Sequence, residues 1–118
     1  MNKEAYYKEI IKLKQHYRSD LLILGHFYMH PDILQLADII GDSYLLSVKA
    51  SKASAKNIIF CGVYFMAESA RILCKEEQHV LIPDKGAGCP LADTITPDAF
   101  TNCMSEISLE FGDPPISV

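Results

Sequence analysis

The chain has 118 residues, of which 49% are hydrophobic and 22% charged. This composition is typical of one folded domain with its own core and excludes a disordered segment. The formal net charge is −4 without a basic cluster, and no apolar run is long enough to span a bilayer, so we expect neither a nucleic-acid partner nor a membrane span.

The first predicted element is an amphipathic helix over about residues 3–18, with Asn2 as its candidate N-cap. Its apolar residues recur at helical spacing, at Tyr6, Ile10, Leu13 and Tyr17. This charged segment is not a secretory signal, so a cytoplasmic location is predicted. Residues 21–24 are all apolar and indicate a strand covered on both faces. Pro31 suits the start of a second helix, which the apolar spacing extends to Gly41.

Ser43 is the candidate N-cap of a third helix, because serine side chains satisfy free N–H groups at helix starts. Further along, residues 58–61 and 80–82 are predicted as strands, and residues 65–74 as the helix between them. Thr96 followed by Pro97 indicates the start of one more helix.

Strands that alternate with helices predict an α/β fold, a three-layer αβα sandwich around a short parallel sheet. Three strands are expected. After Ala99 the apolar pattern weakens, so we predict a domain over residues 1–99 and a divergent tail over residues 100–118.

Four cysteines are present, at positions 61, 74, 89 and 103, and no two of them form a C-x-x-C pair. In a cytoplasmic protein such cysteines are expected to be thiols or metal ligands rather than disulfides. Cys89 is the candidate ligand, because Gly86 and Gly88 allow a bulky group to approach the backbone. Pro90 could open a helical turn that favours the thiolate. The alternative is that Cys89 is a small buried hydrophobic residue.

Polar side chains follow the predicted strands, and parallel strands bring their carboxyl ends to one edge, where ligands bind. His26 and Tyr28 follow the first strand, and Cys89 comes soon after the last. We therefore predict that these residues share a pocket. A zinc site of Cys89 with His26 and His30 is a weaker alternative, because Pro31 makes a continuous helix through both histidines improbable.

Four segments in this order resemble the N-terminal third of the quinolinate synthase family. They are LILGHFY (residues 22–28), LADIIGDS (residues 36–43), IFCGVYFMAESARIL (residues 59–73) and GCPLAD (residues 88–93). The resemblance implies one of three similar αβα domains around a central site. It also implies a 4Fe–4S cluster held by one cysteine from each domain, with one iron open as a Lewis acid.

In this resemblance, Cys89 matches the first cluster cysteine. The implied reaction condenses iminoaspartate with dihydroxyacetone phosphate to quinolinate in NAD biosynthesis. His26 matches a residue that binds a substrate carboxylate, and Ser43 a serine with the same task. Tyr28 matches the tyrosine that orients substrate or relays a proton.

The family's second and third domains, with the other two cluster cysteines, are absent from these 118 residues. We therefore expect a form with little or no activity alone. The alternative is a non-catalytic αβα module that binds a small anion. Such a module could also assemble with a copy of itself or with a chain that supplies the missing domains.

Overall fold

The computed structural model describes residues 2–112. The chain divides into two compact units, Met1–Gly88 and Cys89–Val118. In the part of the chain that is described, no helix is both long enough and apolar enough to cross a membrane. The domain boundary predicted at Ala99 stays a prediction.

The first unit is built on a parallel sheet whose strand order is β2-β1-β3-β4. The two central strands are β1 (Leu21–His26) and β3 (Asn57–Cys61). The edge strands β2 (Ile39–Gly41) and β4 (His79–Leu81) are short, with three residues each. Because successive strands are added first on one side of β1 and then on the other, the winding reverses between β1 and β3.

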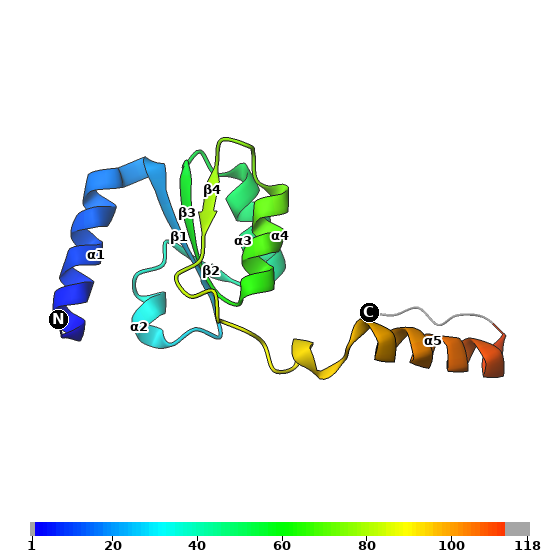
Figure 1. Cartoon of the computed structure of the whole chain (residues 1–118). Coiled ribbons are helices and arrows are strands. Elements are labelled where there is room, and N and C mark those ends of the chain that lie inside the picture. Colours follow the sequence, from blue (N-terminus) through cyan, green and yellow to red (C-terminus); the bar gives the residue numbers. More distant parts are fainter. Residues whose placement is uncertain (1, 113–118) are drawn as a thin grey trace. The chain divides into compact units, whose positions relative to one another are not determined.

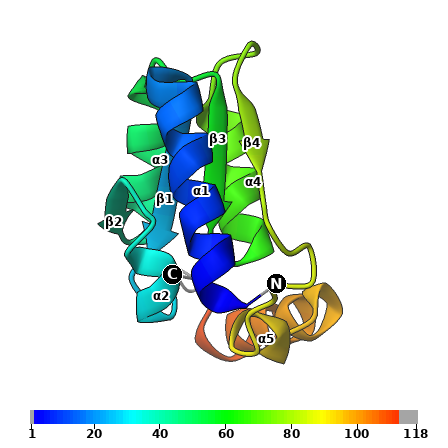
Figure 2. The same cartoon turned by 90° about the vertical axis from the view of Figure 1, so that its left-hand side faces the viewer.

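Helices cover both faces of this sheet, which confirms the predicted three-layer αβα fold. On one face lie α1 (Lys3–Tyr17) and the single-turn helix α2 (Pro31–Leu34), with a 3-10 turn at Arg18–Asp20 leading into β1. On the other face lie α3 (Ser43–Lys52) and α4 (Tyr64–Leu73). Figure 1 shows the two layers on either side of the sheet, and Figure 2 shows α1 in front of it with α3 and α4 behind.

The second unit contains a 3-10 helix (Ala92–Thr94) and the helix α5 (Pro97–Phe111). The predicted start of α5 is confirmed, since the side chain of Thr96 accepts a hydrogen bond from the N–H of Ala99 at 3.2 Å. The predicted cap of α1 is confirmed in the same way, because Oδ1 of Asn2 accepts from the N–H of Ala5 at 3.0 Å.

The predicted long helix between Pro31 and Gly41 is wrong. Its apolar spacing suited a helix, but α2 ends at Leu34 and the chain becomes extended to form β2, a fourth strand. The N–H of Asp38 donates to the carbonyl of Ile23 at 2.7 Å, so pairing with β1 replaces the helical hydrogen bonds.

The core lies between the sheet and the face covered by α3 and α4. Four large side chains there are fully buried, namely Leu24, Leu46, Ile58 and Phe60. The alanines Ala50, Ala67 and Ala70 complete the cluster and let α3 and α4 approach closely. By contrast, α1 contributes no buried residue to the opposite face, so the stability of the unit depends mainly on the α3–α4 side.

Gln78, in the loop before β4, is almost completely buried, at 3% exposure. Its side-chain amide donates to the carbonyls of Ala50, Ala53 and Ala55 at 3.1–3.3 Å, and its Oε1 accepts from the N–H of Lys75 at 3.0 Å. One side chain thus binds carbonyls in the last turn of α3 and in the loop that follows it, and no pattern in the sequence distinguishes it from a surface glutamine.

Replacing Gln78 by alanine is expected to lower the free energy of unfolding by about 1–3 kcal/mol, because it leaves buried carbonyls without a donor. Urea denaturation followed by circular dichroism measures this change. Glu77→Ala is the matched control, since Glu77 is an exposed neighbour whose loss should change stability by less than about 0.5 kcal/mol. Equal effects of the two substitutions would contradict this role of Gln78.

Candidate functional site

The carboxyl ends of β1 and β3 define the candidate site. Ligands of open parallel sheets bind where the strand order reverses, because the loops there leave toward opposite faces and open a crevice. β1 ends at His26, which is paired with Gly41 at the end of β2. The N–H of Phe27 donates to the carbonyl of Gly41 at 3.1 Å, so the turn that contains Asp42 and Ser43 begins next to His26.

The imidazole of His26 is fixed from three sides. The residue is only 4% exposed, and its Nδ1 accepts a hydrogen bond from the N–H of Tyr28 at 3.3 Å. The ring stacks on Phe27 with centroids 4.6 Å apart and lies 4.8 Å from the ring of Tyr28. Because Nδ1 is an acceptor, the proton of the neutral ring is on Nε2, which is then available as a donor.

Two opposing effects act on the pKa of His26. Burial lowers the pKa below its ordinary value of 6.5, because the charged ring is poorly solvated, and the carboxylate of Asp42 partly offsets this by raising it. Burial is the larger effect, so His26 is a neutral hydrogen-bond donor at neutral pH.

The predicted N-cap role of Ser43 is wrong. The cap of α3 is Asp42, whose Oδ1 accepts from the N–H of Leu45 at 2.8 Å. Asp42 was missed, although an aspartate before a helical run is as good a capping signal as a serine. Ser43 is instead the first helical residue and is half-buried. Within residues 2–112 its hydroxyl has no hydrogen-bond partner, so it is free to bind a ligand at the start of α3.

Tyr28 lies just beyond β1 and is 78% exposed. Its backbone is held by the hydrogen bond to His26, while its phenol reaches solvent. The structure therefore brings His26, Tyr28 and the 42–43 turn to one edge of the sheet, and the role of His26 and Tyr28 as site residues stays a prediction.

Gly62 also lies at this edge, and the structure shows that it packs between Phe60 and His26. A Cβ atom there would lie 2.8 Å from Cε1 of Phe60 and 3.5 Å from Cβ of His26. The first distance is shorter than real carbon contacts allow, so only glycine fits between the core and His26 without displacing the Phe60 ring.

Cys89 is the first residue of the second unit and is half-buried. Its carbonyl accepts from the N–H of Asp93 at 3.0 Å, which forms a turn, but only a three-residue 3-10 helix follows. In the first unit, the loop before it is held by the N–H of Tyr64, which donates to the carbonyl of Ala87 at 2.8 Å. That Cys89 shares a pocket with His26 and Tyr28 stays a prediction.

The other three cysteines differ in their surroundings. Burial raises the pKa of both Cys61 and Cys74, the latter against a smaller opposing effect of Arg71, so both favour the neutral thiol. Cys103 is exposed on α5. Among the described residues, no three cysteine, histidine or acidic side chains form a group able to hold a metal ion. These residues do not fit a complete 4Fe–4S site, and Cys89 supplies one ligand at most.

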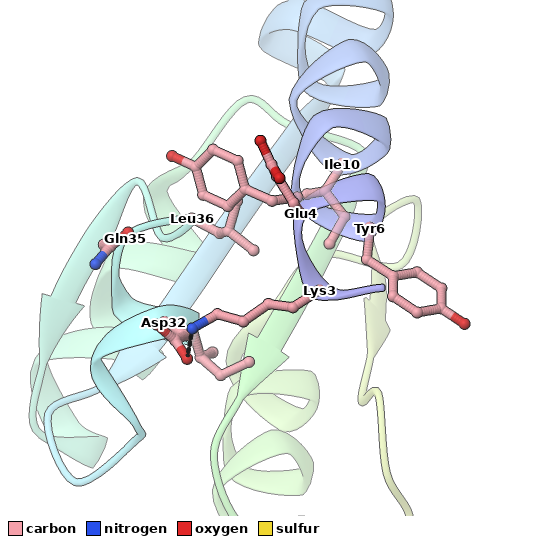
Figure 3. Close-up of a pocket in the computed structure, with 9 residues that line it drawn as sticks. Lys3, Glu4, Tyr6, Ile10, Asp32, Gln35 and Leu36 are labelled. Atoms are coloured by element: carbon pink, nitrogen blue, oxygen red, sulfur yellow. Dashed lines mark ion pairs between the residues drawn. The ribbon is translucent and has the colours of Figure 1, made fainter. Parts of the chain in front are cut away.

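A hollow of about 690 Å³ lies elsewhere, between α1 and α2. Its walls are mainly apolar side chains such as Tyr6, Ile10 and Leu36, and an ion pair between Lys3 and Asp32 spans it (Figure 3). None of the predicted site residues lines it.

Comparison with known proteins gives a consistent result. The family described as "Quinolinate synthetase A protein" matches residues 8–112. The quinolinate synthase of Herpetosiphon aurantiacus is 46% identical over 98 residues, which cover 83% of this chain and 26% of that protein. The enzyme of Corynebacterium glutamicum is 38% identical over 91% of this chain and 27% of its own length. That of Bacillus cereus is 39% identical, with 98% of this chain and 32% of its own length covered.

The chain thus spans about a quarter to a third of the length of these curated relatives. The matched segment begins inside α1 and ends just after α5, so it includes all four strands and the residues of the candidate site.

The His26 ring is expected to titrate below pH 6.5, because its burial disfavours the charged form. Asp42→Asn should lower the midpoint further, since asparagine keeps the helix cap but removes the carboxylate that raises the pKa. Carbon-detected NMR titration of the histidine rings measures both midpoints, and the loss of one signal in His26→Asn assigns the resonance. Asp32→Asn should leave the His26 midpoint unchanged.

The sign of the stability effect follows from the lowered pKa. Above pH 6.5 both folded and unfolded chains hold His26 neutral, and below it the unfolded chain takes up a proton more readily. The stability contributed by neutral His26 is therefore lost as the pH falls below 6.5. A His26 midpoint at or above 6.5, or one that Asp42→Asn does not lower, would show that this electrostatic description is wrong.

Proposed function

The chain belongs to the quinolinate synthetase A protein family, and from this premise we propose that it forms the N-terminal αβα part of a quinolinate synthase. In this proposal, His26, Ser43 and Tyr28 bind and orient the substrates iminoaspartate and dihydroxyacetone phosphate for quinolinate formation in NAD biosynthesis. The observation that carries the proposal is the pairing of His26 with Gly41, which supports a common position for these groups at one sheet edge.

In its neutral form, His26 binds a carboxylate of the substrate. Its Nε2–H is oriented by the hydrogen bond that Nδ1 accepts from Tyr28, and a donor fixed in this way loses little entropy when it binds. A hydrogen bond to an ionised carboxylate is stronger than one between neutral groups. The bound anion would also raise the pKa of His26, so we expect substrate binding to promote proton uptake.

Ser43 supplies a second donor for a carboxylate. Its hydroxyl lies in the first turn of α3, where free backbone N–H groups and the helix dipole favour negative charge. The carboxylate of Asp42 already accepts one of these N–H groups and adds negative charge nearby. This negative charge weakens the attraction of a simple anion. A ligand binds well only when its own anionic groups reach both Ser43 and His26, which favours a rigid dicarboxylate.

Tyr28 has a different task. Its exposed phenol is both a donor and an acceptor, so it can orient a substrate hydroxyl or pass a proton to it. The stacked His26 and Phe27 rings lie beside it and provide an apolar surface for one side of a ligand.

The 4Fe–4S cluster of the family supplies Lewis-acid chemistry when it is bound. We propose that Cys89 is one of its ligands in an assembled enzyme and that these 118 residues alone do not hold it. None of the steps above depends on the cluster. The alternative function, a non-catalytic module that binds a small anion, uses the same donors without turnover.

Quinolinate is expected to bind the chain at the His26 edge and to shift the amide resonances of residues 26–28 and 42–45 in NMR titrations. Ser43→Ala should weaken binding roughly tenfold or more, because it removes a hydrogen bond to a charged group. Ser51→Ala is the matched control on the same helix, where the hydroxyl is used by the carbonyl of Val48. An affinity for quinolinate that neither Ser43→Ala nor His26→Gln lowers would contradict the roles assigned to these two residues.

Iron–sulfur reconstitution of the 118-residue chain is expected to yield no stable 4Fe–4S absorption and no quinolinate. The physical reason is that one thiolate cannot replace the ligand set of a cluster. Iron and sulfide analysis with anaerobic absorption spectroscopy measures this outcome, with Cys89→Ser as the comparison. Steady quinolinate production by the chain alone would refute the expectation and favour a self-sufficient enzyme.

A further inference from the structure

Asp38 replaces part of the hydrogen bonding between β1 and β2 with its side chain. Its N–H donates to the carbonyl of Ile23 at 2.7 Å, as in a normal parallel ladder. The N–H of Ile23, however, donates to Oδ2 of Asp38 at 2.8 Å instead of to a backbone carbonyl. Asp38 thus binds both the donor and the acceptor of one β1 residue.

Lys14 of α1 completes this arrangement. Its Nζ donates to the carbonyl of Leu36 at 2.7 Å and lies 2.7 Å from Oδ1 of Asp38. Asp38 therefore accepts from the N–H of Ile23, and Lys14 donates to the carbonyl of Leu36. In a regular ladder, a backbone N–H and a backbone carbonyl of this kind would bond to each other. The Lys14 side chain is 22% exposed, against 70–74% for the other paired lysines of α1, so this pair is not an ordinary solvated ion pair.

β2 needs such a device. It has three residues and lies at the edge of the sheet, where its described neighbour is β1, so few ladder hydrogen bonds fix its register. A slip by one residue would move the following chain by about 3.3 Å and turn its side chains to the other face. The residues that would move are Asp42 and Ser43, which follow β2 directly.

We propose that Asp38, held by Lys14, is a positioning residue that sets the register of β2 on β1 and so places Ser43 beside His26. Asp38 itself touches no part of the candidate binding edge and acts through the strand. The role of Asp38 in the register of β2 is independent of the proposed function. Only its consequence for substrate binding by Ser43 rests on that function.

A second ion pair provides a natural control. Lys3 of α1 pairs with Asp32 of α2, but this pair lies on a more exposed part of the surface and binds no group of the β1–β2 ladder (Figure 3). Removing Asp32 loosens α1 without changing the hydrogen bonds of Ile23. A difference in amide exchange between the Asp32→Ala and Asp38→Ala variants is therefore due to the β1–β2 hydrogen bonds and not to a looser attachment of α1.

The experiment is amide hydrogen exchange by NMR on the 118-residue chain. The Phe27 N–H, which donates to Gly41, reports the far end of the β1–β2 pairing, and the β3 amides report global stability. We expect Asp38→Ala to speed exchange at Phe27 roughly tenfold relative to β3, and Asp32→Ala to leave this ratio unchanged. Asp38→Asn should restore only part of the protection, because its side-chain oxygen still accepts from Ile23 but its NH2 group cannot pair with Lys14.

Lys14→Met keeps the aliphatic stem of the lysine and should give an intermediate increase, so it tests the proposal even where Asp38→Ala does not fold. An equal loss of protection at β3 and Phe27, or an unchanged ratio, would overturn the positioning role. A selective loss at Phe27 in a chain that does not bind quinolinate would support the positioning role and count against the proposed function alone.

Discussion

The parallel pairing of β1 with β3 is the interaction on which the rest of the first unit depends. It runs from the pair Leu21–Asn57 to the pair Gly25–Cys61 and buries Leu24 and Phe60 completely. Each edge strand pairs with one of these two strands, and the winding of the sheet reverses between them. The same pairing that builds the core therefore also opens the crevice at the carboxyl ends, because the loops that follow the strands must leave toward opposite faces.

The two faces of the sheet are held by different forces. On the side of α3 and α4, close packing of alanines against Leu46 and Ile58 removes apolar surface from water. On the other side, α1 buries no residue, and the ion pair of Lys14 with Asp38 is less exposed than the other ion pairs of its lysines. The directional contacts of the second face contribute less burial, but they fix which residues of β1 and β2 lie opposite each other.

The binding edge combines groups whose charges oppose one another. Burial keeps His26 neutral, Asp42 partly restores its affinity for a proton, and the first turn of α3 offers a partial positive charge that Asp42 already partly neutralises. The net charge of such an edge attracts anions only weakly. In the proposed function, selectivity comes instead from fixed donors at defined positions, which suits recognition of a rigid ligand with two acceptor groups.

The sequence by itself determined the class of fold, because apolar periodicity and turn residues are local. The amphipathic spacing of Tyr6, Ile10 and Leu13, with Asn2 as cap, predicted α1 almost to the residue, and four motifs identified the family. The edge strand β2 was decided only in three dimensions, because hydrogen bonds between Asp38 and Ile23, fifteen residues apart, outweigh the helical spacing of residues 33–40. The buried partners of Gln78 and the fit of Gly62 against Phe60 likewise depend on segments that only folding brings together.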